Sequence, residues 1–213
     1  MPAHPKNQIS LKTIRSAAVT RTRLIEAASQ VFARLGVQGA TTREIARVAG
    51  VNEVTLFRHF ASKEQLLKAV IENALRLQTE ALAHPEAWTQ DLRTDLKHYA
   101  ELYNTMLEAQ EDLIRTFIGE AKRHPEAAKQ VIEEAVKPLA EKLVAYLQSC
   151  QKRGTVRTDI NPLPAVDMFT GMLLAGMLCR NAKLKHNSYS RDEYIDTCVD
   201  VVVRGIEARS GEK

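Results

Sequence analysis

Apolar residues recur through most of the chain at spacings of three and four, the pattern of helices with one buried face. The first such stripe includes Leu24, Ala28, Val31 and Leu35, and Gly36 is expected to end it together with Gly39. Further stripes run through residues 62–75, 89–106, 113–121, 125–153, 162–182 and 190–206. The pattern therefore predicts a succession of amphipathic helices.

Residues that favour helix starts stand in front of these stripes. A Ser or Thr followed three residues later by Glu or Gln can bond reciprocally with the first turn of a helix. This spacing occurs at Thr41 and Glu44, at Ser62 and Gln65, and at Ser190 and Glu193. Asn52 and the pair Asn161-Pro162 suit the same position, so the sequence predicts helix starts at all five places.

The composition also favours helices over strands. The chain is rich in Ala, Leu, Glu, Lys and Arg, and its nine Gly and seven Pro leave long periodic runs uninterrupted. With 213 residues, of which 45% are hydrophobic, it can bury a real core. We expect an all-α protein of nine or ten helices, because Pro138 must either kink the helix of residues 125–153 or split it in two.

Charge is concentrated at the N-terminal end. Residues 1–76 hold 12 Lys and Arg against 5 Asp and Glu, whereas the rest of the chain holds 18 against 21. Such a split predicts a basic module that meets a polyanion and a nearly neutral module with another task, although solvated surface charge is the simpler alternative. We assign residues 1–16 to a disordered basic arm, 17–78 to the basic module and 79–213 to the second module.

The cysteines and the longest apolar run exclude some classes of protein. Cys150, Cys179 and Cys198 are odd in number and widely spaced, which argues against a disulfide framework and a zinc site, so we expect small buried residues. The apolar run of residues 168–179 is shorter than the roughly 20 residues that span a bilayer, and it predicts a buried helix. Because the N-terminus shows no apolar leader segment, we expect a cytoplasmic protein without a membrane partner.

Two short helices joined by a tight turn are predicted within the basic module. Thr41 opens the first helix, Gly50 supplies the turn and Asn52 opens the second helix. A helix-turn-helix unit places its second helix in the major groove of DNA and its first helix across the backbone. Its inner positions must be small at the crossing and large and apolar beneath the second helix, as Ala46 and Leu56 are.

The second short helix carries four bulky residues in a row, FRHF at 57–60. At 100° per residue, an inward Leu56 places Val54 and Arg58 on the opposite side and returns Phe60 to the core. The remaining members of the row can then contact DNA, by apolar contact from Phe57, by bidentate recognition of a guanine edge from Arg58 and by a hydrogen bond from His59 to phosphate.

The stretch ATTREIARVAGVNEVTLFRHFASKEQLL (residues 40–67) resembles the DNA-binding domain of the TetR (tetracycline repressor) family, whose pattern is roughly T-x-x-x-I-A-x-x-A-G-V-S-x-x-T-L-Y-x-H-F-x-S-K-E-x-L. The resemblance covers about residues 18–78. Asn52 replaces a common Ser, and Phe57 replaces a common Tyr whose hydroxyl often reaches phosphate. Lys63 lies in the first turn of the next helix, where free N–H groups favour an anion. The residues predicted to contact DNA are Thr42, Arg43, Asn52, Val54, Thr55, Phe57, Arg58, His59 and Lys63.

By the same resemblance, residues 79–213 form a helical domain that binds a small effector and dimerises through its last two helices, in a four-helix bundle. The apolar faces of 166–182 and 194–206 exceed what one small domain readily buries, and small residues such as Gly171, Ala175 and Gly176 permit close helix approach. Met and aromatic residues at helical spacing can line a pocket or fill a core. As pocket residues we take Trp88, His98, Tyr103, Met106, Phe117, Leu139, Met168, Phe169 and Met172, with His98 and Tyr103 orienting an apolar effector.

Catalytic and metal chemistry have little support in the sequence. Asp95 and His98 form one carboxylate-x-x-His pair, and Glu120 with His124 shares a helix face. A di-iron bundle would need two Glu-x-x-His motifs and two further glutamates. HExxH, GxSxG and phosphate-binding glycine motifs are missing from the sequence. We therefore predict no enzymatic activity, no catalytic residue, no metal and no cofactor.

These features predict a homodimeric transcriptional regulator, a repressor that a small, apolar effector releases from a palindromic operator in double-stranded DNA. Two alternatives stay open. One is a constitutive DNA-binding regulator without an effector. The other is a helical metalloprotein or enzyme that retains a DNA-binding module.

Overall fold

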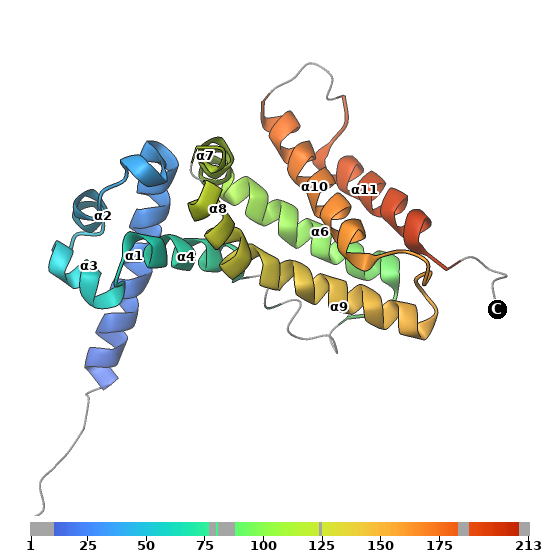
Figure 1. Cartoon of the computed structure of the whole chain (residues 1–213), viewed down its shortest axis with the longest axis horizontal. Coiled ribbons are helices and arrows are strands. Elements are labelled where there is room, and N and C mark those ends of the chain that lie inside the picture. The colour runs from blue at the N-terminus through green and yellow to red at the C-terminus, as the bar shows by residue number, and fades with distance from the viewer. Residues whose placement is uncertain (1–10, 77–79, 81–87, 124, 183–187, 209–213) are drawn as a thin grey trace, which may run out of the picture. The chain divides into compact units, whose positions relative to one another are not determined.

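A computed structural model describes residues 11–76, 80, 88–123, 125–182 and 188–208 (Figure 1). Every named element in these ranges is a helix, and the one β feature recorded there is an isolated bridge between Val156 and Glu207. The all-α prediction is therefore confirmed for the described residues. The chain divides into two compact units, residues 1–70 and 71–213.

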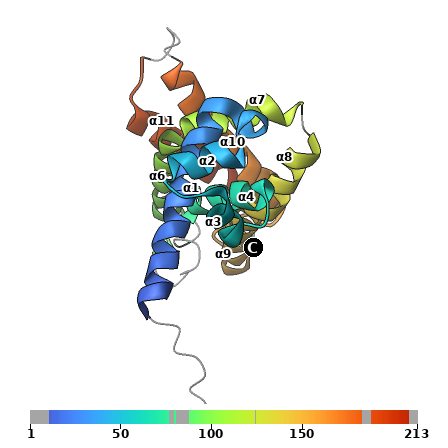
Figure 2. The ribbon, with the colours of Figure 1, turned by 90° about the vertical axis from the view of Figure 1, so that its left-hand side faces the viewer.

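The N-terminal unit consists of α1 (Leu11–Gly39), α2 (Thr42–Val48), α3 (Glu53–His59) and the first part of α4 (Lys63–Ala74). Helix α2 packs against α1, the longest helix of the unit, and α3 packs against α2 (Figures 1 and 2). The core of this unit is made of fully buried apolar side chains from all four helices: Leu24, Ala28, Phe32, Ile45, Leu56 and Leu66.

The predicted starts of α2, α3 and α4 are confirmed by their hydrogen bonds. The Glu44 amide donates to Thr41 Oγ1 at 3.1 Å, and the Thr55 amide donates to Asn52 Oδ1 at 2.7 Å. The Gln65 amide donates to Ser62 Oγ at 3.2 Å. These side chains each satisfy an amide that the first turn of a helix leaves without a backbone partner.

The first helix differs from the prediction at its start. Residues 11–16, which we expected in a disordered arm, form the first turns of α1. Residues 1–10 of the expected arm lie outside the described residues. At the other end of α1, Gly36 has φ 74° and breaks the helical backbone, in agreement with the prediction that glycine ends this helix.

The C-terminal unit contains α6 (Leu92–Ala109), α7 (Glu111–Ala121), α8 (Pro125–Val131), α9 (Lys137–Arg153), α10 (Pro162–Asn181) and α11 (Arg191–Ile206). Helix α10 packs against α6, α9 and α11, so these four helices enclose the core of the unit (Figure 1). The largest buried side chains in this core are Leu96, Tyr99, Leu107, Leu143, Phe169, Leu173 and Met177.

The helix of residues 125–153 is not split at Pro138 but changes its hydrogen-bond pattern just before it. A π-helical segment, η2 (Ile132–Val136), joins α8 to α9, and Pro138 is the second residue of α9. Proline has no N–H to donate to the preceding turn, and a local π-helical turn is one way in which a helix accommodates such a break. The helix that we expected from about Thr89 begins instead at Leu92, and Asp91 caps it by accepting from the Thr94 amide at 2.8 Å.

Helices α10 and α11 approach each other closely at Gly176. A Cβ atom added at Gly176 would lie 2.1 Å from the Tyr194 ring, and the Tyr194 hydroxyl donates to the Met172 carbonyl at 2.8 Å. Only glycine permits this contact, so the predicted role of Gly176 is confirmed within one chain. Gly171, in contrast, has open space around its Cα.

One face of α10 is not covered within the chain. By length and composition α10 could cross a membrane, although core helices of soluble proteins can have the same length and composition. Only 33% of its most apolar 18-residue stretch is buried. The prediction of a buried helix is therefore correct for one side of α10 only. Cys150 and Cys198 are buried as expected, whereas Cys179 is exposed because it lies on this uncovered face.

Candidate functional site

The turn between α2 and α3 is fixed by contacts from both sides. Gly50 has φ 66°, a conformation that favours glycine. Arg23, from α1, donates to the carbonyl of Ala49, and a Cβ at Gly50 would lie 2.8 Å from the same guanidinium. The Thr42 hydroxyl donates to Glu53, which joins α2 to the start of α3. The orientation of α3 is therefore set by α1 and α2 together.

The inner side of α3 anchors the helix in the core. Leu56 is fully buried and Phe60 is buried at the helix end, as the helical arithmetic predicts. The guanidinium of Arg21, from α1, lies 4.5 Å from the centre of the Phe60 ring. Arg21 therefore makes a cation–π contact within the protein.

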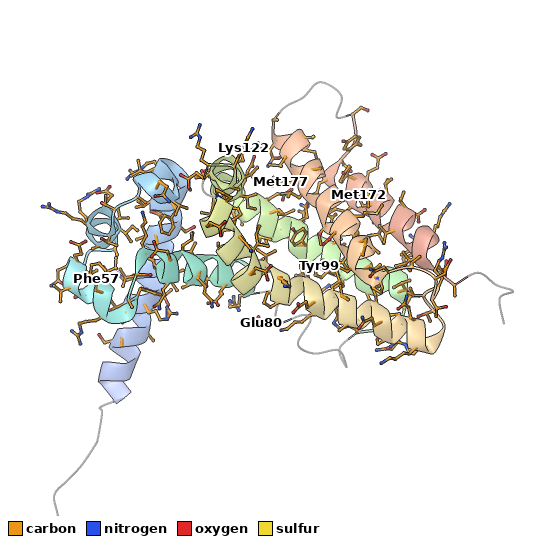
Figure 3. All side chains as sticks on the ribbon, in the orientation of Figure 1. Phe57, Glu80, Tyr99, Lys122, Met172 and Met177 are labelled. Carbon is orange, nitrogen blue, oxygen red and sulfur yellow. The ribbon has the colours of Figure 1, made fainter. Side chains whose placement is uncertain are left out.

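The outer side of α3 presents a bulky, exposed row. Val54 is 70% exposed and Phe57 is 48% exposed, and Arg58 is exposed beside them. Figure 3 shows Phe57 projecting outward from α3. Thr55 and His59 are half-buried on the flanks of this row. Large exposed apolar side chains on a helix that is otherwise well anchored are typical of a contact surface.

The cations around this row fall into two groups. Arg34 and Arg47 both pair with Glu44, at 2.9 Å and 2.8 Å. Hydrogen bonds from Arg47 first, and from Arg34 next, lower the pKa of Glu44 to about 2. Arg43 and Arg58 are exposed and have no hydrogen bond or ion pair within the part of the chain that the structure describes. They are the guanidiniums that remain available for phosphates or bases.

The structure assigns Lys63 a role that differs from the expected phosphate contact. Its ammonium donates to the carbonyls of Val37 and Ala40, at 2.9 Å and 3.2 Å, and is partly buried. Those carbonyls stand at the C-terminal end of α1, where the last turn of a helix leaves acceptors unpaired. Lys63 therefore ties α4 to the end of α1, and a DNA contact by its ammonium would require these bonds to break.

Asn52 and Thr55 are also engaged with each other. Besides the capping bond, the Thr55 hydroxyl donates to Asn52 Oδ1 at 2.7 Å. The single hydroxyl proton of Thr55 is thus already donated within the protein. The side-chain amide nitrogen of Asn52 is left to act as a donor toward DNA, whereas Thr55 would first have to turn its hydroxyl.

In the C-terminal unit, the predicted pocket residues occupy three kinds of position. Those that lie in the core are Trp88, Met106, Leu139 and Phe169. Those that are only partly buried are Tyr103, Phe117 and Met172. Those that face outward are His98 and Met168. Tyr103 stacks on the buried Tyr99 with ring centres 5.8 Å apart, and burial raises the pKa of Tyr103 to about 12.

The assignments of His98 and Met168 to the pocket are wrong for the same physical reason. Each precedes a core aromatic residue, Tyr99 and Phe169 respectively, and neighbours on a helix point about 100° apart. His98 is exposed on α6, and Met168 is 67% exposed on α10. Neither can orient a ligand inside the unit.

Two buried polar groups were missed by the sequence reasoning. The Asp95 carboxylate accepts from the Thr89 amide and hydroxyl and, at 2.7 Å, from the Tyr146 hydroxyl. It joins the start of α6 to α9 and is not free for a metal. Asn104 is fully buried and accepts from Arg180 at 2.9 Å. Both residues lie on the apolar side of a predicted helix, and this position could have indicated in the sequence that they are buried.

A surface groove of about 710 Å³ lies along α6 and α11. Its walls carry two ion pairs, Arg93 with Asp200 and Lys97 with Asp196, the second at 2.7 Å. None of the predicted pocket residues lines this groove. The described residues contain no group of three His, Cys, Asp or Glu that could hold a metal ion, and His124 lies outside them.

The uncovered faces of α10 and α11 are apolar or small. On α10, exposed residues repeat at helical spacing as Met168, Gly171, Ala175 and Cys179. On α11, the exposed residues at the same spacing are Thr197, Val201 and Gly205. We call these seven residues the α10–α11 face. Exposure of such an apolar surface to water is unfavourable, and a second helix pair could cover it.

Family comparisons divide the chain in the same way as its charge. Residues 24–70 match the family described as "Bacterial regulatory proteins, tetR family". Residues 87–202, more than half of the chain, match "Tetracyclin repressor-like, C-terminal domain". The chain is thus matched in both its basic and its nearly neutral part.

Individual relatives are regulators as well. The HTH-type transcriptional regulator YvkB of Bacillus subtilis is 27% identical over 192 residues, which cover 89% of this chain and 98% of YvkB. SrpR of Pseudomonas putida, another HTH-type transcriptional regulator, is 45% identical over 60 residues, 28% of each chain. The solved structure of Salmonella enterica GusR superposes with a TM-score of 0.67 at 22% identity, over 93% of this chain and all of GusR. This last likeness shows the fold alone.

Proposed function

Because the chain belongs to the TetR family of bacterial regulatory proteins, a family of DNA-binding transcriptional regulators and not of enzymes, we propose that it works as a cytosolic homodimeric repressor. It binds a palindromic operator through α3 and leaves the operator when a small molecule binds the C-terminal unit. The observation that carries this proposal is the outer row of α3, in which Arg58 is unpaired among the described residues and stands beside the exposed Val54 and Phe57.

The chemistry of that row suits the major groove. A guanidinium can donate two hydrogen bonds to the O6 and N7 atoms of guanine, which distinguishes one base pair from the others. Val54 and Phe57 offer apolar contact to thymine methyl groups. Arg43, exposed at the start of α2, lies on the helix that crosses the DNA backbone in such units and is suited to phosphate.

The α10–α11 face supports the dimer. Its small residues on α10 allow two helix pairs to approach closely, and Val201 supplies apolar area on α11. A surface used symmetrically by two copies gives a two-fold axis, and two copies of α3 would then read the two halves of a palindrome. We infer that this face packs against a second copy of the chain and does not enter a membrane.

The effector would act on the relative position of the two α3 helices. A small molecule that binds better to the conformation with wrongly spaced α3 helices shifts the protein away from DNA. The partly buried Tyr103 and Met172 support an interior contact with such a molecule, because they pack against the core without being fully enclosed in it.

The dimer can be tested with two matched variants. Val201→Glu places a charge on the α10–α11 face, whereas Ile132→Glu places one at a similarly exposed apolar site on η2. Sedimentation is expected to show monomers for the first variant and dimers for the second, and operator affinity should fall by about 100-fold or more only for the first. Dimeric Val201→Glu protein that binds its operator normally would exclude this face as the dimer contact.

A further inference from the structure

The interior of the C-terminal unit contains a cationic cluster where α6, α10 and α11 meet. Arg180 of α10 donates through Nη2 to Asn104 Oδ1 at 2.9 Å and approaches Glu108 Oε1 at 3.5 Å. Arg191 of α11 lies 3.8 Å from the same Glu108 oxygen and donates to the Thr105 hydroxyl at 3.1 Å. Two guanidiniums therefore share one carboxylate.

Several donors of this cluster have no acceptor among the described residues. Asn104 is completely buried, and its amide nitrogen Nδ2 is unpaired. The Arg180 side chain is 11% exposed, and its Nη1 is unpaired. Each of these nitrogens shares a carbon with an atom of the 2.9 Å bond between the two residues, so the two donors lie close together. Buried donors of this kind nearly always have a partner in a folded protein.

The charge of the cluster indicates what that partner is. Arg180 and Arg191 contribute two positive charges and Glu108 one negative charge, which leaves one positive charge, and of these three side chains Arg180 is the one that is nearly buried. A water molecule could accept the hydrogen bonds but would not compensate the charge. A carboxylate does both, because its two oxygens match the planar donors of a guanidinium.

The neighbourhood of the cluster is apolar and aromatic. Tyr103 precedes Asn104 on α6 and stacks on Tyr99, which in turn lies 6.2 Å from Phe169, measured between ring centres. Met177, one helical turn before Arg180, is fully buried (Figure 3). From Phe169 to Arg180 the interior side of α10 extends about 16 Å, at 1.5 Å per residue.

We infer that the effector of this protein is an apolar carboxylic acid, whose carboxylate is held by Arg180 and Asn104 and whose apolar body lies toward the partly buried Tyr103. This inference rests on the proposed effector-controlled repression and specifies its ligand. It replaces His98, which is exposed, with Arg180 as the group that orients the effector.

The test compares acids with neutral molecules of the same shape. Octanoate and 4-phenylbutyrate are titrated into the full-length protein by calorimetry, and octan-1-ol and 4-phenylbutan-1-ol serve as uncharged partners. The same four compounds are added to the protein–operator complex while DNA release is followed by fluorescence anisotropy. The acids should bind at least about tenfold more tightly than the alcohols, because only the acids form a hydrogen bond between two charged groups. They should release DNA at correspondingly lower concentration.

Three variants locate the acid preference. Arg180→Gln removes the charge, and Asn104→Leu removes the amide at similar volume, so the two variants test the charge and the amide separately. Arg180→Gln should bind acids and alcohols equally, and Asn104→Leu, which keeps the charge, should show a smaller preference for acids than the wild-type protein. Arg153→Gln, at the exposed end of α9, changes the same residue type far along the chain and should retain the preference.

The outcomes separate the inference from the proposed function. Operator binding without any added compound is measured first, and its absence would count against the repressor and not against the ligand class. If the operator is bound but neither acid binds, or the alcohols bind equally well, the carboxylate inference is overturned. An acid preference that survives undiminished in Asn104→Leu and Arg180→Gln would also overturn it.

Discussion

In the N-terminal unit, the cations behind α3 are used for structure: Arg34 and Arg47 pair with Glu44, Arg23 caps the end of α2, and Lys63 bonds to the end of α1. Among the residues that the structure describes, guanidiniums without a hydrogen bond or ion pair lie on its surface, at Arg43 and Arg58. In the described part of the C-terminal unit, buried donors without an acceptor include Asn104 Nδ2 and Arg180 Nη1.

The difference matches the task that we propose for each unit. A surface that reads DNA needs a rigid support and free donors that point to solvent, because the geometry of base edges is fixed. An interior that responds to a small molecule needs donors that are satisfied only when the molecule is present, because differential binding drives the conformational change. The position of the unpaired donors thus distinguishes the proposed recognition surface from the proposed sensing interior.

The largest expected effect comes from the support of α3. Leu56→Ala removes a fully buried side chain and should lower the free energy of unfolding of the N-terminal unit by about 3 kcal/mol. Hydrogen exchange in α2 and α3 should accelerate, whereas the fluorescence transition of Trp88, the one Trp in the chain and a core residue of the other unit, should not move. Val54→Ala on the outer side of α3 is the control and should leave exchange unchanged. Equal exchange rates in the two variants would contradict the assignment of the inner face.

The next effect separates recognition from support among two basic residues. Arg58→Ala should weaken binding to the selected operator by about 2 kcal/mol and relax preference at one or two base positions, with no loss of stability. Lys63→Met should instead lower the free energy of unfolding by about 1 kcal/mol, because the carbonyls of Val37 and Ala40, at and just after the end of α1, lose their donor. Binding assays on operator and scrambled duplexes, with parallel denaturation curves, distinguish the two. A change in base preference for Lys63→Met would contradict its structural role.

A comparable effect is expected where α10 meets α11. Gly176→Ala forces a methyl group against the Tyr194 ring and should lower the free energy of unfolding of the C-terminal unit by about 2 kcal/mol, read from Trp88 fluorescence. Gly119→Ala, in the interior of α7 with open space around it, should raise that free energy by up to about 1 kcal/mol. If both variants shift stability in the same direction, the close approach at Gly176 is not as described.

The smallest effect concerns acid stability of the N-terminal unit. The pKa of Glu44 falls from its ordinary 4.5 to about 2 in the folded protein, chiefly through its hydrogen bond to Arg47. A depressed carboxyl pKa contributes stability above pH 4.5 that is lost as pH falls toward 2. The gap in stability between the wild-type protein and Glu44→Gln should therefore be constant near neutral pH and shrink below about pH 4.5. Because both arginine partners of Glu44 are exposed to solvent, the gap is small, and a pH-independent gap would show that the ion pairs do not form in solution.

Local features of the fold could be predicted from the sequence. Thr41, Asn52 and Ser190 cap helices as expected, because a cap bonds to an amide only two or three residues away. Leu56 and Phe60 face the core because helix geometry relates them directly.

Roles that depend on distant partners could not be predicted. Lys63 and Arg23 each bond to carbonyls 26 residues away, and Asp95 meets Tyr146 across 51 residues. In the absence of the fold, a cation in a basic module resembles a phosphate ligand, and Met168 resembles its buried neighbour Phe169. The exposed and buried sides of α3 were therefore predicted correctly, whereas the contacts of Lys63 and Arg23 and the interior polar groups were missed.

The central claim is sequence-specific recognition of a palindrome by a dimer, and selection of bound duplexes from a random DNA pool tests it most directly. At near-physiological salt, the purified protein should enrich one palindrome whose half-sites are spaced by the helical repeat of DNA. Arg58→Ala should enrich it with altered preference within each half-site. A folded, dimeric wild-type protein that enriches no sequence, or only single asymmetric sites, would contradict the account.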